Sequence, residues 1–380
     1  MYTNRDEQLT AILGAGIDSL DIPEDQYQVA KNAYKTASNF LREYWADSDT
    51  DGAMYPQGSM RLGTVTRLIH RNDEYDLDMV CKHDLDKSEI TQAALKADVG
   101  EALRQFAKAH PESGLELDDE GRRCWTFKHK TLPFHLDVLP ALPNPKAPDA
   151  GILVTDTEAF RWHTSDPIGY ADWFLDRQRQ EWTVGMQRVA MRKQMEVEEL
   201  SRRAFKTTLQ RTVQALKRHR DLYFAKDLKN RPASIIITTL AARSYEPGGS
   251  LFEVLCYVVQ KMPELVEGGL GGYAVSNPVV PAENFADRWK GHPARARRFF
   301  EWMEQAQKDF AEIGAVDGID NVIQKAAAAL GPNVGRAAQH AFGEGFRTMR
   351  VDGRMIMATA TGALTQGTTK PVPQHIFHGE

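Results

Sequence analysis

Cysteine is scarce in this chain, and the few that occur are poorly placed for cross-linking. The 380 residues include three cysteines, Cys81, Cys124 and Cys256. Their number is odd and no two form a C-x-x-C pair, so the spacing predicts neither a disulfide framework nor a zinc site. This usage is typical of a reducing cytosol, and we expect the protein to be cytoplasmic.

Long apolar runs are also missing. The most apolar stretch, residues 254–259, is far too short to span a bilayer. The first residues, M-Y-T-N-R-D-E-Q, do not have the basic stretch followed by an apolar one that a signal peptide has. We therefore expect neither a membrane span nor a membrane partner.

No charge of one sign dominates. Lysine and arginine number 47 against 52 aspartates and glutamates, which gives a net charge of −5. Both signs are dispersed, and this argues against a protein that coats long nucleic acids by neutralising their phosphates. Small anionic substrates need only a local basic lining. The motif G-x-x-x-x-G-K-[ST] is absent as well, which excludes a P-loop enzyme.

The first part of the chain mixes helices and strands. Apolar residues spaced by three and four predict a long helix over residues 24–46, and we expect it to come first. A second helix is predicted over 88–109. Short apolar runs predict strands over 54–57, 75–81, 115–117, 124–128 and 134–139. Residues 140–150 hold four prolines and are predicted to form a loop.

The second part is predicted to be helical. A length of 380 residues with 42% hydrophobic content indicates two domains rather than one. Helical spacing recurs over 168–182, 205–224, 233–245, 251–262, 294–310, 319–330 and 334–347. Residues after 358 are rich in Thr, Gly and Pro, and we expect them to lie outside any core. The chain thus divides into a mixed α+β half and a helical half.

Two carboxylates interrupt an apolar strand. Asp76 and Asp78 lie in E-Y-D-L-D-M-V, and strand alternation places both on one face while Leu77 and Met79 face the core. Asp137 stands alone in the apolar strand 134–139. Like charges held close repel, and a divalent cation relieves the repulsion; magnesium held with substrate phosphates suits such oxygen ligands. The competing interpretation, a solvated strand edge, does not explain the third aspartate.

A small pair of residues precedes these carboxylates. Gly58 and Ser59, in Q-G-S-M-R-L-G-T, open a predicted helix, where free N–H groups and the helix dipole favour a phosphate. Gln57 precedes the pair and is grouped with it as nucleotide-binding. Arg61 lies in the same helix and either meets phosphate or pairs with an acid. His135 and His129 lack a second ligand at metal-binding spacing, and we predict a structural role for them.

Together these motifs resemble the DNA polymerase β-like nucleotidyltransferase superfamily. Q-G-S-M-R-L-G-T, L-D-V-L-P-A and N-P-V-V-P-A-E-N-F are similar to the bacterial relatives of cyclic GMP-AMP synthase, the CD-NTases. The resemblance implies an α+β fold: a polymerase β-like core with a mixed sheet, preceded by a long N-terminal helix and followed by a helical domain. The implied boundaries are 1–165 for the core with its spine helix, 166–357 for the helical domain and 358–380 for a flexible tail.

The resemblance also implies a chemistry. Asp76, Asp78 and Asp137 would be the catalytic residues and would hold two Mg²⁺ ions, with Mn²⁺ as a possible substitute. A ribose hydroxyl of one nucleoside triphosphate attacks the α-phosphate of a second, pyrophosphate leaves, and another round closes the ring. The expected product is a cyclic dinucleotide or trinucleotide used as a second messenger in anti-phage defence. The alternatives are a nucleotidyltransferase that makes linear products or modifies RNA or protein, and an inactive nucleotide-binding module.

Two residues of the helical half are assigned through the same resemblance. Lys217 lies beside the apolar line Leu209, Val213 and Leu216 and would reach a triphosphate, with a solvated helix face as the alternative. Ser234 matches a serine that contacts phosphate in relatives, with an N-cap as the alternative. Relatives that stack the donor base carry an aromatic residue beside this serine, where this chain has isoleucine.

The C-terminal tail carries one further prediction. It is expected to be an ordinary frayed terminus. The alternatives are that it engages a partner protein of a defence operon, with Phe377 as its exposed aromatic residue, or that it is a site of covalent attachment.

Overall fold

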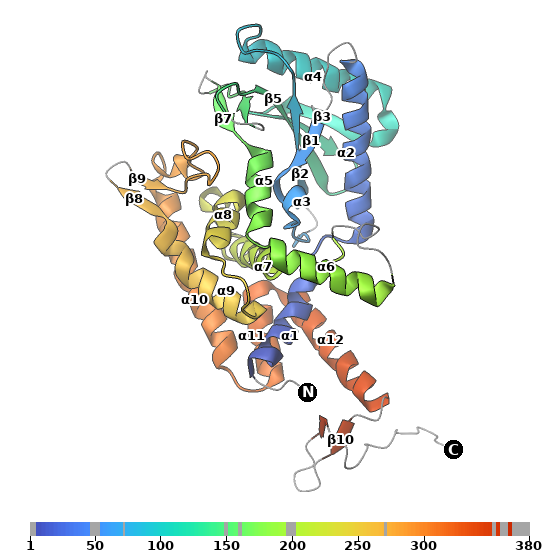
Figure 1. Ribbon diagram of the computed structural model, residues 1–380, viewed down its shortest axis with the longest axis vertical. Coiled ribbons are helices and arrows are strands. Elements are labelled where there is room, and N and C mark those ends of the chain that lie inside the picture. The colour runs from blue at the N-terminus through green and yellow to red at the C-terminus, as the bar shows by residue number, and fades with distance from the viewer. Residues whose placement is uncertain are drawn as a thin grey trace.

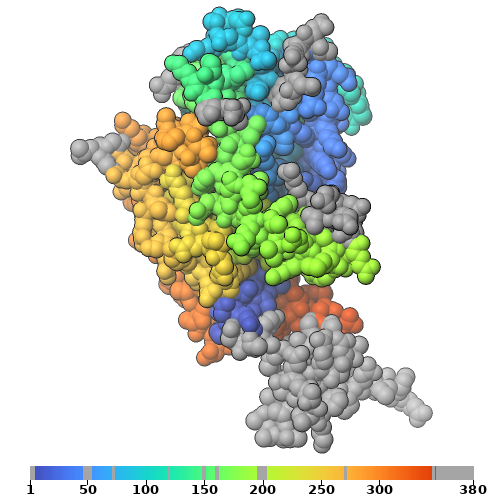
Figure 2. All heavy atoms as spheres, in the orientation of Figure 1, coloured from blue at the N-terminus to red at the C-terminus, as the bar shows by residue number. Residues whose placement is uncertain are grey.

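The computed structural model divides into a sheet-containing part and a helical part (Figure 1). It describes residues 5–45, 54–70, 73–147, 151–158, 162–194, 203–269, 272–351, 355–357 and 364–366. In the space-filling view the yellow and orange helical part and the blue and cyan sheet part are separate masses with green residues between them (Figure 2). The predicted α+β class is confirmed.

The sheet is mixed, with one parallel pair at its centre. The strands are β1 (Met54–Gln57), β2 (Tyr75–Lys82), β3 (Leu115–Glu120), β4 (Trp125–His129), β5 (Phe134–Pro143), β6 (Ile152–Val154) and β7 (His163–Ser165). The order is β1-β2-β5-β4-β3, with β6 paired to β5 and β7 to β6. β2 and β5 run parallel and every other pair in this sheet is antiparallel. The parallel pair carries all three aspartates singled out above.

Strand β5 is longer than predicted, because it continues through Pro140 to Pro143. Ala141 accepts a hydrogen bond from His83 of the loop after β2, so the alternate residue Pro140 faces the other neighbour. On that side of β5, the pairing with β4 reaches only as far as Val138, and the pairing with β6 starts at Ala141. The missing N–H of proline therefore breaks no ladder bond, and the proline-rich segment begins as a strand rather than as a loop.

Two helices cover one face of this sheet. They are α2 (Glu24–Tyr44) and α4 (Gln92–Ala109), both near their predicted bounds. Leu41, Val99 and Phe106 from these helices pack with the strand residues Leu77 and Leu136 in one buried cluster. Their apolar stripes thus cover the face opposite the aspartates, because neighbouring strand residues point to opposite sides.

The helical part follows the predicted pattern with small shifts. Its helices are α5 (Pro167–Asp176), α6 (Arg179–Lys193), α7 (Thr208–Tyr223), α8 (Ser234–Ser244), α9 (Leu251–Lys261), α10 (Pro293–Ala315), α11 (Ile319–Leu330) and α12 (Pro332–Val351). The predicted helix 168–182 is two helices, because the chain turns at Gln178 before α6. A short hairpin of β8 (Glu267–Gly269) and β9 (Gly272–Ala274) was not predicted.

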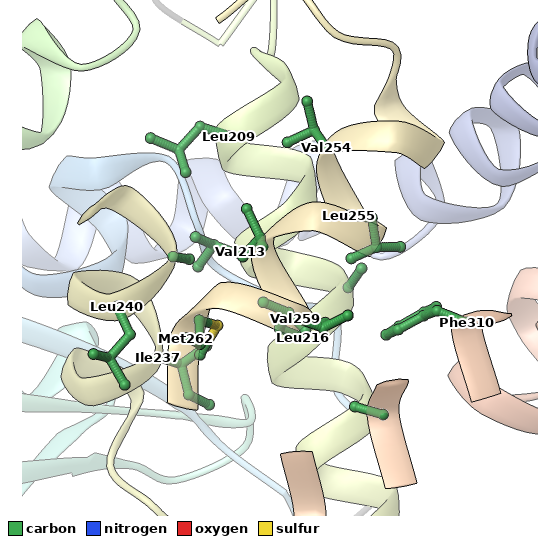
Figure 3. Close-up of a cluster of buried hydrophobic side chains, with 14 of the residues drawn as sticks. Leu209, Val213, Leu216, Ile237, Leu240, Val254, Leu255, Val259, Met262 and Phe310 are labelled. Carbon is green, nitrogen blue, oxygen red and sulfur yellow. The ribbon is translucent and has the colours of Figure 1, made fainter. Parts of the chain in front are cut away.

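The apolar line on α7 faces a core, as predicted. Leu209, Val213 and Leu216 belong to one buried cluster with side chains of α8 and α9, and Val213 and Leu216 lie near these in Figure 3. All three are fully buried. Burial of each such side chain stabilises the fold by about 1.5–3 kcal/mol relative to exposure, and α7 is therefore a central element of the helical part.

The prediction that helix 24–46 comes first is wrong. An earlier helix, α1 (Arg5–Asp18), precedes it and lies among the helices of the C-terminal half (Figure 1). Leu9, Leu13 and Ile17 of α1 are buried in the helical cluster. Each of the helices that the structure describes is too short or too polar to cross a membrane.

The predicted tail, residues 358–380, is described only at β11 (Leu364–Gln366), which pairs with β10 (Met355–Met357). The remainder, Phe377 included, lies outside the described residues, and the predicted partner site there stays a prediction. The predicted boundaries near 165 and 357 also stay predictions. We propose one change to them: α1 belongs with the helical domain, because its apolar side chains are buried there.

Candidate active site

The aspartates form a cross-strand group on the face of the sheet that α2 and α4 leave open. In the parallel β2–β5 pair, Asp76 lies opposite His135 and Asp78 lies opposite Asp137. Leu77 between the two β2 aspartates is buried on the other face. The predicted alternation is therefore present, and the parallel register brings the distant Asp137 beside Asp78.

Three ligand atoms of this group lie close enough to share a cation. One ligand atom each from Asp76, His135 and Asp137 all lie within 4.8 Å of one another. His135 Nε2 is 3.2 Å from Asp76 Oδ1, and its Nδ1 is 3.2 Å from Glu74 Oε2. The hydrogen bond to Asp76 raises the pKa of His135 to about 9. His135 was predicted to be structural, yet it stands within the candidate metal group.

Asp78 is a half-buried carboxylate at the centre of the site. Burial, followed by the charges of Asp76 and Asp137, raises its pKa to about 7. Gly58 packs against it: the residue has φ 62°, and a Cβ added there would lie 2.0 Å from Asp78 Oδ2. Any larger residue would collide with the carboxylate as well as strain the backbone. The contact with Asp78 therefore explains glycine at position 58, whether or not the segment binds phosphate.

Asp137 is fixed by its neighbour on β4. Thr126 Oγ1 donates a 2.6 Å hydrogen bond to Asp137 Oδ1. The two residues lie opposite one another in the antiparallel β4–β5 pair. The carboxylate is therefore oriented from the strand next to the one that bears it.

The segment after β1 lines the site. Helix α3 (Gly58–Leu62) follows Gln57, which lies opposite Asp78 in the β1–β2 pair. Arg61 Nη1 is 3.4 Å from the carbonyl oxygen of Pro56. No acidic side chain among the residues that the structure describes pairs with Arg61. The predicted contact of Arg61 with phosphate stays a prediction.

Helix α7 holds the loop that leaves α3. Four of its side chains donate hydrogen bonds to backbone carbonyl oxygens of this loop: Gln210 to Leu62, Gln214 to Val65, Lys217 to Thr64 and Arg218 to Arg67. All four donors are buried. Buried carbonyl groups need such partners, and α7 therefore fixes the loop between the predicted phosphate-binding residues and β2.

Lys217 is part of this contact rather than a solvated helix residue. Its side chain is 5% exposed and its Nζ lies 2.8 Å from the Thr64 oxygen. Burial and, next, the charge of Arg220 lower its pKa to about 8. A lysine with a single carbonyl partner keeps donor capacity for a second ligand.

Ser234 is not an N-cap. The N-cap of α8 is Ala233, and Ser234 is the first helical residue. Its hydroxyl accepts a 2.9 Å hydrogen bond from Arg220 Nη1. The buried Arg220 also donates to the Pro232 carbonyl oxygen, so arginine and serine are positioned together.

One cavity of about 870 Å³ joins these elements. Its lining includes every predicted nucleotide-binding residue and two of the three predicted catalytic aspartates: Gln57, Gly58, Ser59, Arg61, Asp76, Asp78, Lys217 and Ser234. Asp137 is not in the lining, although Asp78 beside it is. The sheet supplies one wall and the helical part the other. The volume is that of a typical small-molecule site.

Residues 53–140 match the model of the family described as cyclic GMP-AMP synthase DncV-like, nucleotidyltransferase domain. The chain carries a nucleotidyltransferase domain of this family. The match spans β1, β2 and β5, and with them all three aspartates. The predicted relationship to the CD-NTases is confirmed.

Two relatives of the chain are named as synthases of cyclic dinucleotides. The chain is 28% identical to the c-di-GMP synthase of Roseivirga ehrenbergii over 100% of this chain and 99% of the relative. It is 24% identical to the cyclic dinucleotide synthase CdnG of Bradyrhizobium diazoefficiens over 74% of this chain and 70% of the relative. The solved structure of the Bradyrhizobium CdnG with GTP has a TM-score of 0.67 at 20% identity, covering 88% of this chain and 99% of that one. The predicted fold is thereby confirmed.

Several residues of the cavity were not predicted from the sequence. Asn277, Glu283 and Phe285 line it from the helical part, and Arg123 lines it from the turn before β4. The first three lie in N-P-V-V-P-A-E-N-F, which was noted only as a likeness. The asparagines and prolines of this motif indicate a structured turn. From the sequence, only this pattern could have pointed to the motif as part of the cavity wall.

Proposed function

We propose that this CD-NTase joins nucleoside triphosphates into a cyclic oligonucleotide. The observation that carries the proposal is the cross-strand carboxylate group at a cavity that also holds Lys217, Ser234 and the Gly58–Ser59 segment. The whole-length likeness to a c-di-GMP synthase supports a cyclic dinucleotide and GTP as a substrate. A role in anti-phage defence and a cytoplasmic location belong to the same proposal.

The carboxylates fit magnesium. Asp76, Asp78 and Asp137 offer hard oxygen ligands on one sheet face. Burial, followed by the charges of Asp76 and Asp137, raises the pKa of Asp78, and a bound cation would favour its ionised form. When bound, divalent ions neutralise charge on the phosphates and on the attacking and leaving oxygens. Mn²⁺ has similar ligand preferences and would fit the same residues.

The remaining residues position the reactants. Lys217, Arg61 and the Gly58–Ser59 segment would hold the triphosphate of the donor, with Ser234 contacting it from α8. Asp137 would accept the proton of the attacking ribose hydroxyl, with Thr126 keeping its carboxylate oriented. The hydroxyl oxygen bonds to the α-phosphorus and the bond to pyrophosphate breaks. A second transfer within the linear product closes the ring.

The test is a product assay. The purified protein is incubated with Mg²⁺ and α-labelled GTP and ATP, and the mixture is treated with phosphatase. A cyclic product has no terminal phosphate, so the proposal predicts small labelled species that resist phosphatase. Labelled protein, or linear species that phosphatase strips, would instead support one of the other nucleotidyltransferase activities. Absence of product with Mg²⁺ and with Mn²⁺ would support an inactive module.

A further inference from the structure

The segment 275–285 is a rigid wall of the cavity. Phe285 N donates to the Val275 oxygen at 2.9 Å, and Asn277 N donates to the Glu283 oxygen at 2.8 Å. Ser276 and Asn284 form an isolated antiparallel bridge between these contacts. The segment is therefore closed on itself, and its cavity-facing side chains are held in place.

A carboxylate points from this wall into the cavity lining. Glu283 Oε2 accepts a 2.7 Å hydrogen bond from Asn277 Nδ2. Among the described residues no donor reaches Oε1. Burial raises the pKa of Glu283, whereas the Asn277 bond and the charge of Arg123 act in the opposite direction. A half-buried carboxylate with one unused oxygen calls for a ligand that donates hydrogen bonds.

An aromatic ring lies two residues further along. Phe285 lines the cavity and packs edge-to-face on Tyr170, with ring centroids 5.9 Å apart at 84°. Tyr170 is itself fixed by a 2.8 Å hydrogen bond with Thr239. A fixed ring and a carboxylate that line the same cavity wall suit a planar base, which can stack on the ring and donate hydrogen bonds to the carboxylate.

We propose that Glu283 selects guanine as the base of a bound nucleoside triphosphate. This inference rests on the proposed function, because it assigns a base to that site. Guanine presents N1–H and N2–H₂ side by side, two donors that match the unused Oε1 and the second lone pair of Oε2, whose first lone pair accepts from Asn277. Adenine presents an acceptor, N1, next to its N6 amino group, so its N1 lone pair would face a carboxylate oxygen.

The decisive variant is Glu283→Gln. Glutamine has the same shape but offers one donor and one acceptor, which suits adenine and leaves a guanine donor facing an amide N–H. We measure equilibrium binding of GTP and ATP to the full-length protein in Ca²⁺, without turnover. The expected change is a fall in the GTP-to-ATP affinity ratio on the order of 10- to 100-fold, since one bidentate base contact discriminates by about that much.

The matched control is Glu267→Gln. Glu267 lies on β8, pairs with Arg243 and Ser276, and is not in the cavity lining. It makes the same chemical change close to the same wall, and its affinity ratio should equal that of the unaltered protein. Phe285→Leu is a second comparison, expected to weaken GTP and ATP alike because stacking is tolerant of the base.

A second measurement needs no variant. Inosine triphosphate lacks the 2-amino group of GTP, so the unaltered protein should bind it more weakly than GTP, and Glu283→Gln should narrow that difference. Equal weakening of all three nucleotides in Glu283→Gln, or equal affinity of the unaltered protein for GTP and inosine triphosphate, would overturn the inference. Neither result depends on product, so a failure of the proposed function would show separately, as absence of a phosphatase-resistant species.

Discussion

At the scale of single residues, the site brings together charges that the fold alone does not favour. Asp78 is half-buried beside two other carboxylates, and Lys217 is buried with a carbonyl oxygen as its partner. Such groups reduce the stability of the folded protein unless a ligand compensates them. Replacing them should therefore separate stability from activity.

Asp78→Asn is expected to stabilise the metal-free protein while abolishing product. Its folded-state pKa, about 7, lies above the unfolded value. The carboxyl therefore contributes stability below the unfolded pKa and loses it as pH rises through about 7. Above that pH the variant should exceed the unaltered protein by on the order of 1–3 kcal/mol.

Thermal unfolding in a chelator across this pH range measures the difference. Identical unfolding curves for the two proteins at every pH would show that the Asp78 carboxylate does not lower the stability of the fold.

Lys217→Met is expected to weaken triphosphate binding without unfolding the protein. Its pKa, lowered to about 8 by burial, means that the charged form is disfavoured in the fold. The penalty is present below about pH 8 and disappears as pH rises to the unfolded value near 10.4. Methionine removes this penalty but leaves the Thr64 carbonyl group without its donor, at a cost of about 1–3 kcal/mol. The two effects oppose one another below pH 8, so Tm should change little there.

The loss of a charged phosphate contact should raise KM for the triphosphate by roughly tenfold or more. Steady-state kinetics and thermal unfolding on the same preparation test both halves of this prediction. Unchanged KM would remove Lys217 from the nucleotide site.

At the scale of elements, the contact between α7 and the loop 62–67 connects the two parts of the chain. Gln214 is 1% exposed and donates to the Val65 oxygen. Gln214→Leu should leave that carbonyl group unsatisfied, lower stability by about 1–3 kcal/mol and lower kcat, because the loop leads from α3 to the aspartates of β2.

Gln307→Leu is the matched control for this prediction. It removes a similar glutamine-to-carbonyl bond, to Val259, between helices away from the cavity. A comparable stability loss with kcat unchanged is expected there. An equal fall of kcat in both variants would mean that the α7 contact acts only through overall stability.

The elements differ in how far the sequence could predict them. The strand around Asp76 and most helices could be predicted because their apolar periodicity is local. Helix α1 could not, since the glycines in L-T-A-I-L-G-A-G-I-D resemble a loop. Gly16 is explained only by its partner, because a Cβ there would lie 2.6 Å from Val334 Cγ1.

At the scale of the whole molecule, the site depends on contacts between segments far apart in the chain. The cross-strand position of Asp137 beside Asp78 was expected, because one face of two apolar strands must carry the polar residues. The hydrogen bonds from buried side chains of α7 and the cavity wall at Glu283 were not expected. No local sequence pattern shows which distant backbone group a side chain will contact. The helical part thus supplies one wall of a cavity whose carboxylates come from the sheet.

The central claim is that carboxylates from two parallel strands act as one site for nucleotidyl transfer. The most direct measurement is the yield of phosphatase-resistant product from Asp137→Asn, set against the unaltered protein and against Asp317→Asn, an exposed aspartate outside the cavity lining. The account predicts that Asp137→Asn makes no detectable product at an unchanged Tm and that Asp317→Asn matches the unaltered protein. Near-normal yield from Asp137→Asn would contradict it.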